Sequence, residues 1–219
     1  MRIVVTDDPA ADAAAVIVRR LRAAVRRRGS ATVAVSGGST APPMIAAIAS
    51  VFRTESSLAA AVTVWQVDER IAPDGDAARN AGQLSDLPCA VLLMPVANVD
   101  LRAAARRYAN SLPDRFDVVH LGIGDDGHTA SWPPLEPSVP LSDRLVELTE
   151  VFNGLRRMTL TAAPVNGARS RVVLARGASK RPMVEGWLRG DPSLPISGVR
   201  RGGTTVILDE SAAPGASLR

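Results

Sequence analysis

Short apolar runs alternate with longer amphipathic stretches along this chain. The runs are rich in Val, Ile and Leu, as strands are, whereas the Ala- and Arg-rich stretches between them have a helical period. Strands are predicted near residues 3–5, 33–35, 63–67, 91–94, 118–121, 145–148, 158–161, 172–175 and 205–208. Helices are predicted over residues 10–28, 42–50, 101–111, 162–168 and 180–188. This alternation predicts an α/β fold with parallel strands and crossover helices.

The chain is predicted to form one domain over residues 1–219. Its length and its 46% hydrophobic content are enough for one sizeable core. No internal repeat is evident, and the Pro-rich segment 133–140 is too short to link two domains. Gly29 is expected to end the first long helix, because glycine readily takes the left-handed conformation found there.

The composition argues against several classes of protein. No apolar run approaches the roughly 18–20 residues that a membrane span requires, and the N-terminus lacks the apolar core of a signal peptide. A single cysteine, Cys89, excludes an internal disulfide framework and suits a reducing compartment. One Cys and two His are too few for a structural zinc site. We therefore expect a cytoplasmic protein with no membrane partner and no metal.

The charge alone would allow a nucleic-acid partner, since the net charge is +4 and the sequence pI is about 10.4. The positive side chains are, however, spread through the predicted helices, and the chain has one tyrosine and no aromatic residues interleaved with them. Solvated helix faces explain this pattern better, so no nucleic-acid partner is expected. Lys180 is the only lysine among these arginines, which marks it as a candidate site residue.

The segment 116–133 is the most informative part of the chain. An apolar strand runs into Gly122, Gly124 and Gly127, with two aspartates and a histidine between and after them. Glycines allow tight turns that hold polar side chains at the carboxyl end of a strand. The unperturbed pKa of a histidine suits proton transfer near neutral pH, so His128 is the candidate general base. His120 lies within the strand and is interpreted as a core histidine.

The same three glycines also satisfy the dinucleotide-binding pattern G-x-G-x-x-G. That pattern requires a helix N-terminus facing a pyrophosphate. Here Asp125 and Asp126 would place carboxylates beside the anion, and the prolines from Pro133 onward would interrupt the helix. Nucleotide binding is therefore not expected here.

A second motif, Ser-Gly-Gly-Ser-Thr at 36–40, follows a predicted strand and precedes Pro42 and Pro43. Backbone amides, hydroxyls and the positive end of the next helix would converge there, which favours an anion-binding cradle. It is neither a Walker A loop nor a G-x-S-x-G nucleophile elbow. An ordinary strand-to-helix turn with a Ser or Thr cap remains the alternative.

Charged residues also follow the strand at 63–67. Asp68, Glu69 and Arg70 could form a surface salt-bridge cluster, but a guanidinium at a strand end is also suited to stabilising an oxyanion. Asn80, after a short polar loop, could add an amide to the same area.

Two later strands bring further cations, Arg157 and Lys180. Lysine binds phosphate as a point charge, so Lys180 opposite the segment 36–40 would complete a phosphomonoester site. A surface lysine at the start of a helix is the alternative.

Taken together and in this order, these segments resemble the 6-phosphogluconolactonase family. The matching segments are 36–40, 68–70, Gly-Ile-Gly-Asp-Asp-Gly-His-Thr-Ala-Ser at 122–131, Gly-Ala-Ser-Lys at 177–180 and the closing strand at 206–213. The resemblance implies a three-layer α/β/α Rossmann-like domain with a mainly parallel sheet, a fold shared with glucosamine-6-phosphate deaminases and ribose-5-phosphate isomerases.

The sequence departs from the family pattern in its loops. Trp132-Pro133-Pro134 replaces the usual Leu-Phe-Pro-Gly, Arg79-Asn80 replaces Ser-Asn, and Thr40-Ala41-Pro42 replaces Thr-Pro. These changes alter loop detail and leave the implied reaction class unchanged.

The resemblance implies hydrolysis of 6-phospho-D-glucono-1,5-lactone to 6-phosphogluconate in the oxidative pentose phosphate pathway. His128 would activate the water and Arg70 would stabilise the oxyanion at C1. Asp68 and Asp126 could each orient His128 or Arg70. The expected binding residues are Gly37, Gly38, Ser39, Thr40, Lys180, Arg157 and Asn80. A phosphosugar lactone is the implied partner, no cofactor is required, and the chain would be a monomer or a homodimer.

Two rival functions share the fold. An amino-sugar phosphate deaminase usually carries an extra carboxylate after its Gly-His and a Tyr in place of Arg70, and neither occurs here. A non-catalytic sugar-phosphate-binding module is the other rival, and the fold alone does not exclude it.

Overall fold

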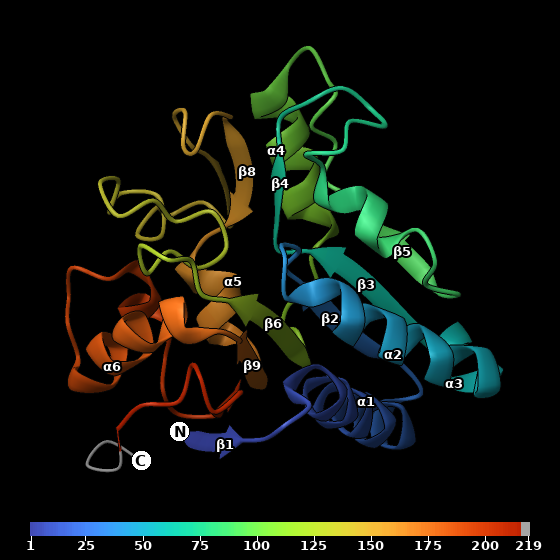
Figure 1. The fold of residues 1–219 in the computed structure, drawn as a ribbon. Helices are drawn as coiled ribbons and strands as arrows, with labels where there is room; N and C mark the ends of the chain where they lie inside the picture. Colours follow the sequence, from blue (N-terminus) through green and yellow to red (C-terminus); the bar gives the residue numbers. More distant parts are fainter. Residues whose placement is uncertain (216–219) are drawn as a thin grey trace.

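The computed structural model describes residues 1–215, and its centre is a parallel sheet (Figure 1). The seven strands lie in the order β1-β10-β9-β6-β2-β3-β5, and every neighbouring pair is parallel. Their bounds are β1 Arg2–Val5, β2 Ala31–Val35, β3 Val62–Gln66, β5 Ala90–Leu92, β6 Val118–Gly122, β9 Ser170–Ala175 and β10 Thr204–Leu208. The predicted α/β class with a mainly parallel sheet is confirmed.

Helices cover both faces of this sheet (Figure 1). On one face, α1 (Pro9–Arg28), α2 (Ala41–Thr54) and α3 (Ser56–Ala60) pack their apolar side chains against the sheet, with Leu21 and Phe52 among the buried residues. On the other face, α4 (Leu101–Ser111), α5 (Ala162–Gly167) and α6 (Arg181–Arg189) do the same, with Tyr108 and Trp187 buried. The two apolar clusters confirm the three-layer α/β/α arrangement.

The order of the strands reverses between β2 and β6. From β2 the chain adds β3 and β5 on one side, and from β6 it adds β9 and β10 on the other. Such a reversal opens a crevice at the carboxyl ends of the two central strands, where ligands bind in open α/β sheets. At this edge the chain leaves β2, β3, β6 and β9. The strand order therefore brings together the segments 36–40, 68–70, 122–131 and 177–180.

A second, smaller sheet was not predicted. It consists of β4 (Asp68–Arg70), β8 (Arg157–Leu160) and β7 (Val146–Leu148), and both pairings are antiparallel. The prediction that the strands near 145–148 and 158–161 join the parallel series was wrong. The chain leaves the main sheet at Val67. The amide of Val67 donates to the carbonyl of Val35 in β2, and its carbonyl accepts from the amide of Leu160 in β8.

The ends of the elements mostly follow the sequence prediction. Gly29 ends α1 with φ 77°, and its amide donates to Val25, as expected. Lys180 belongs to the 3-10 turn η2 (Ala178–Lys180), so α6 begins one residue later than predicted. Four short helical elements of the described chain were not predicted: α3, η1 (Asn80–Leu84), η2 and η3 (Pro195–Gly198). Within residues 1–215, no helix has the length and apolar character needed to cross a bilayer.

Candidate active site

One cavity at the crevice brings together the predicted site residues. All of them except Asp126 line it, and they come from the loops after β2, β6 and β9, from β4 and β8, and from the start of η1. The lining residues among those predicted are Gly37, Gly38, Ser39, Thr40, Asp68, Arg70, Asn80, His128, Arg157 and Lys180. Segments more than 100 residues apart in the chain thus share one wall, as the ends of parallel strands allow.

The loop after β6 presents His128 to the cavity. Gly124 donates its amide to the His128 carbonyl at 2.7 Å, and Gly127 has φ 80°. A Cβ on Gly124 would overlap the imidazole of His128, so a side chain at 124 would displace the ring. No helix follows β6 within residues 123–145, and the helix that the dinucleotide-binding pattern requires is therefore missing.

Asp126 is the carboxylate that contacts the imidazole of His128. Its Oδ1 contacts Nδ1 of the imidazole and also accepts the His128 amide at 3.1 Å. Burial opposes ionisation of Asp126, but the hydrogen bonds from His128 outweigh burial and lower the pKa of the carboxyl. An ionised Asp126 fixes the tautomer of the ring, with the proton on Nδ1 and the lone pair on Nε2.

Asp68 has different partners. It is buried, and the hydroxyls of Ser36 and Ser131 each donate to one of its oxygens at 2.8 Å. Of the two carboxylates between which the sequence could not choose, Asp126 is thus the one that contacts His128. Asp68 instead holds the hydroxyl of Ser36, which lines the cavity, and that of Ser131, a fully buried residue to which the sequence gave no role.

Two guanidinium groups lie next to each other on the small sheet. Arg70 and Arg157 occupy paired positions on β4 and β8. Arg70 donates to the carbonyl of Ala78 at 2.6 Å, and Arg157 lies 3.4 Å from the Ser131 hydroxyl. Burial lowers the pKa of Arg157, and the nearby charge of Asp68 opposes this shift. Among the described residues the buried Nε atoms of both arginines have no hydrogen-bond partner, so neither guanidinium is fully paired with protein acceptors.

Phe152 is a neighbour of the site that the sequence analysis missed. Its ring meets the His128 imidazole edge-on with centroids 5.1 Å apart, and the Arg157 guanidinium lies 4.8 Å from its centre. It sits at the start of a tight turn in which Asn153 and Gly154 both have positive φ. The Asn-Gly pair signals such a turn in the sequence, but nothing there indicates which residues the turn would touch.

The segment 37–40 lies at the N-terminus of α2. Gly38 has φ 104°, and a Cβ on Gly37 would overlap the side chain of Asn80, so this turn requires both glycines. Thr40 is the N-cap residue but makes no side-chain capping bond. The alternative of an ordinary Ser/Thr-capped turn is therefore not supported, and the helix end keeps free donors for an anion.

Lys180 reaches the same cavity from η2. Its side chain is 14% exposed, which argues against a mere surface lysine, and its Nζ bonds Asp125 at 2.7 Å. The hydrogen bond from Lys180, followed by one from Ser179, lowers the pKa of Asp125. Asp125 is largely exposed, so its ion pair with Lys180 can be replaced by a contact between Lys180 and a ligand of stronger negative charge.

Two further features bear on the chemistry. His120, which we interpreted as a core residue, is fully buried, and burial lowers its pKa to about 4, partly opposed by the Ser36 backbone. It is therefore neutral at pH 7 and shielded from solvent. Within residues 1–215 there is no group of three or more His, Cys, Asp or Glu side chains placed to hold a metal ion.

Comparison with known proteins identifies related sequences. The family described as glucosamine-6-phosphate isomerases/6-phosphogluconolactonase matches residues 5–208. A 6-phosphogluconolactonase from Streptomyces coelicolor is 31% identical over 200 residues, which cover 78% of this chain and 76% of that protein. A 6-phosphogluconolactonase from Synechocystis is 40% identical over 98 residues, and this match spans only 40% of each chain.

Solved structures show the same fold. The 6-phosphogluconolactonase of Thermotoga maritima superimposes with a TM-score of 0.83 at 22% identity, covering 95% of this chain and 98% of that one. A monomeric glucosamine-6-phosphate deaminase superimposes almost as well, with a TM-score of 0.80 at 19% identity and full coverage of both chains. The fold is thus common to both activities and does not choose between them.

Proposed function

Because the chain belongs to the glucosamine-6-phosphate isomerase/6-phosphogluconolactonase family, we propose that it hydrolyses 6-phospho-D-glucono-1,5-lactone to 6-phosphogluconate in the oxidative pentose phosphate pathway. The curated relatives named 6-phosphogluconolactonase support this activity. The observation that carries the proposal is one cavity that combines a carboxylate-backed histidine, two adjacent guanidinium groups and an anion cradle with a lysine.

His128 acts as the general base. Asp126 engages Nδ1, which leaves Nε2 to take a proton from a water as that water attacks C1 of the lactone. The tetrahedral intermediate then collapses with cleavage of the bond between C1 and the ring oxygen. His128 returns its proton to that oxygen, which becomes a hydroxyl, and C1 becomes a carboxylic acid that releases its remaining proton to solvent to give the carboxylate of the product.

Arg70 stabilises the negative charge that develops on the C1 oxygen. Its guanidinium is held by the Ala78 carbonyl before substrate arrives, so little reorganisation is needed in the transition state. Arg157 binds the substrate beside it. Burial lowers the pKa of Arg157, and the nearby negative charge of Asp68 opposes this shift and so favours the charged guanidinium.

The phosphate of the substrate binds at the other end of the cavity. The free amides at 37–40, the hydroxyls of Ser39 and Thr40 and the ammonium of Lys180 provide the donors. A phosphate dianion outcompetes the single charge of Asp125 for Lys180. Asn80 also lines the cavity, where its side chain can contact the hydroxyls of the sugar.

The residues around His128 favour a lactonase over a deaminase. The five residues after His128 include no carboxylate that could assist ring opening, and Thr129, Ala130 and Ser131 are nearly fully buried. Arg70, in turn, is a cation placed where an oxyanion forms. Turnover of the lactone would also exclude a module that only binds sugar phosphates.

Replacing Lys180 with Ala is expected to raise KM for the phosphorylated lactone roughly ten- to hundred-fold, the usual effect of losing a charge-assisted contact. Some loss of kcat is compatible with this role, because remote binding energy also positions the reacting carbon. Steady-state kinetics on 6-phosphogluconolactone and on unphosphorylated gluconolactone measure the effect.

The unphosphorylated lactone has no group for Lys180 to hold, so its slow hydrolysis should hardly change in the Lys180→Ala variant. Arg181→Ala is the matched control, because Arg181 is the next residue but bonds the carbonyls of Glu210 and Ser211 outside the cavity. Equal losses on both lactones would show that Lys180 supports the fold or the chemistry instead of the phosphate.

A further inference from the structure

We propose that Glu69 is a positioning residue for the lactonase reaction, acting through Arg70 and Asn80; this inference rests on the proposed function. Glu69 lies between Asp68 and Arg70 on β4, but its side chain is fully buried and does not line the cavity. A buried carboxylate is costly unless it is fully hydrogen-bonded, so the partners of Glu69 indicate what it is there to hold.

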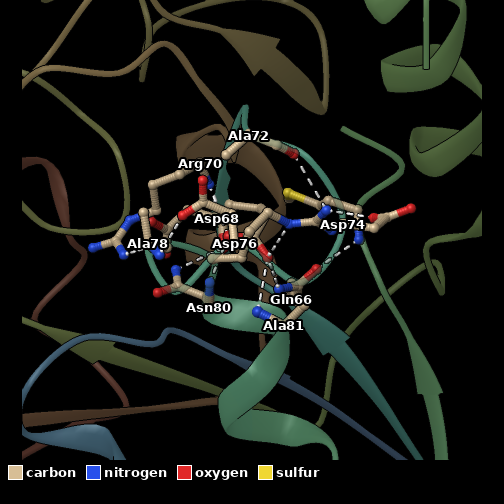
Figure 2. A network of polar contacts seen from close by, with 12 residues as sticks. Gln66, Asp68, Arg70, Ala72, Asp74, Asp76, Ala78, Asn80 and Ala81 are labelled. Carbon is tan, nitrogen blue, oxygen red and sulfur yellow. Dashed lines mark hydrogen bonds and ion pairs between the residues drawn. The ribbon is translucent and has the colours of Figure 1, made fainter. Parts of the chain in front are cut away.

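The Glu69 carboxylate accepts hydrogen bonds from four residues, Gln66, Arg70, Asn80 and Ala81, which are labelled in Figure 2. Oε1 accepts the backbone amides of Arg70 at 2.8 Å and Asn80 at 2.6 Å. Oε2 accepts the amide of Ala81 at 2.8 Å and the side-chain amide of Gln66 at 2.9 Å. The Nε of Arg79, itself buried, forms an ion pair with Oε2 at 3.3 Å.

These contacts close the loop between β4 and η1. Arg70 and Asn80 are the residues at its two ends, and a single carboxylate oxygen binds both of their amides. Glu69 also caps the N-terminus of η1 through the amides of Asn80 and Ala81. One side chain in the protein interior therefore joins the two ends of the loop at residues 71–79, and Arg79, which pairs with the same carboxylate, also bonds Ala72 and Asp74 within the loop.

The two residues that flank this loop, Arg70 and Asn80, both line the active-site cavity. The Arg70 guanidinium rests on the carbonyl of Ala78, a residue of this loop, so a shift of the loop moves the group that meets the oxyanion. Asn80 donates its side-chain amide to the Asp68 carbonyl at 3.1 Å and lies directly against Gly37 of the phosphate cradle. Glu69 thus sets the spacing between the oxyanion site and the cradle without touching the substrate.

The inference predicts a specific effect for Glu69→Gln. The change is nearly isosteric, but it turns one acceptor oxygen into an NH₂ group that must face backbone or side-chain donors. We expect the variant to fold, with a lowered unfolding temperature, and to lose about 10²-fold in kcat, because a small displacement of a catalytic group has an effect of that order. Its KM should change much less.

A double-mutant cycle distinguishes positioning from general destabilisation. In an Arg70→Ala background the guanidinium that Glu69 positions is gone, so adding Glu69→Gln should lower kcat by less than about three-fold. The same large loss in both backgrounds would overturn the proposal, as would a Glu69→Gln variant with the kcat of the wild type. Glu69→Asp, which keeps an acceptor-only group on a shorter side chain, should recover part of the lost kcat.

If Glu69→Gln does not fold, the cycle is run with Glu69→Asp, and the same two outcomes decide. Glu147→Gln is the matched control: Glu147 accepts from Ser142 and from the Leu148 amide, outside the cavity, and this variant should keep kcat within about two-fold. Wild-type turnover is measured first. If the wild type does not hydrolyse the lactone, the proposed function fails. If the wild type is active but the losses from Glu69→Gln and Arg70→Ala are additive, only the positioning role of Glu69 is refuted.

Discussion

Replacing His128 with Asn is expected to lower kcat for 6-phosphogluconolactone by roughly 10²–10⁴-fold, the usual contribution of a general base. Asparagine can still hydrogen-bond Asp126 but cannot accept a proton from water near neutral pH. The His128 side chain is 23% exposed and at the edge of the core, so the variant should fold and bind substrate with a similar KM. Stopped-flow or steady-state kinetics with correction for spontaneous hydrolysis measure the loss.

The other histidine supplies the control for this experiment. His120 is fully buried in β6, so His120→Asn should change the free energy of unfolding and leave the turnover of the folded fraction near that of the wild type. Loss of turnover in a folded His120 variant together with normal turnover in the His128 variant would reverse the assignment of the base.

Arg70→Ala is expected to lower kcat by about 10²–10³-fold, the range seen when one donor to an oxyanion is removed. Arg70→Lys should recover only part of this, because an ammonium is a point charge without the fixed fork of a guanidinium. Arg157 stands at the paired position on β8 and can still contribute to the oxyanion, which keeps the loss below that of the general base.

Arg144→Ala is the matched control for Arg70, since Arg144 is 62% exposed, pairs with Glu147 and lies outside the cavity. A variant of Arg70 that keeps kcat but raises KM would mean that the guanidinium binds substrate and transition state equally well. The oxyanion role would then have to be given up.

The ends of the parallel strands could be predicted well from the sequence, and they located the site. Residues 36–40 and 122–131 carry a strand, glycines and polar groups in one local pattern, so their place at the carboxyl edge follows from chain order alone. Lys180 stood out because it is the only lysine. In each of these cases the residue types that indicate the site lie within a few positions of one another or at a single position.

What could not be predicted depends on contacts between distant segments. The antiparallel pairing of β4 with β8 joins residues about ninety positions apart, and no local pattern reports it. The position of Phe152 over His128 and Arg157 follows from that pairing, because the turn that carries Phe152 leads into β8. From the sequence, Glu69 could belong to a charged surface cluster. In the structure it is buried and accepts hydrogen bonds from the first amides of η1.

The choice between the two aspartates shows the same limit. Asp126 is two residues from His128, and their contact is local, but a spacing of two does not say whether the side chains meet. Asp68 follows β3, and its partners Ser36 and Ser131 come from two other loops. Both assignments needed the tertiary structure.

The central claim is tested most directly by the initial rate of 6-phosphogluconolactone hydrolysis by the purified protein in the presence of EDTA. The rate is read as 6-phosphogluconate formed, beside a parallel assay for ammonia released from glucosamine 6-phosphate. We predict hydrolysis well above the spontaneous rate, no loss with EDTA, and no ammonia. A lactone rate equal to the spontaneous one, activity that EDTA removes and a divalent ion restores, or steady release of ammonia would contradict the account.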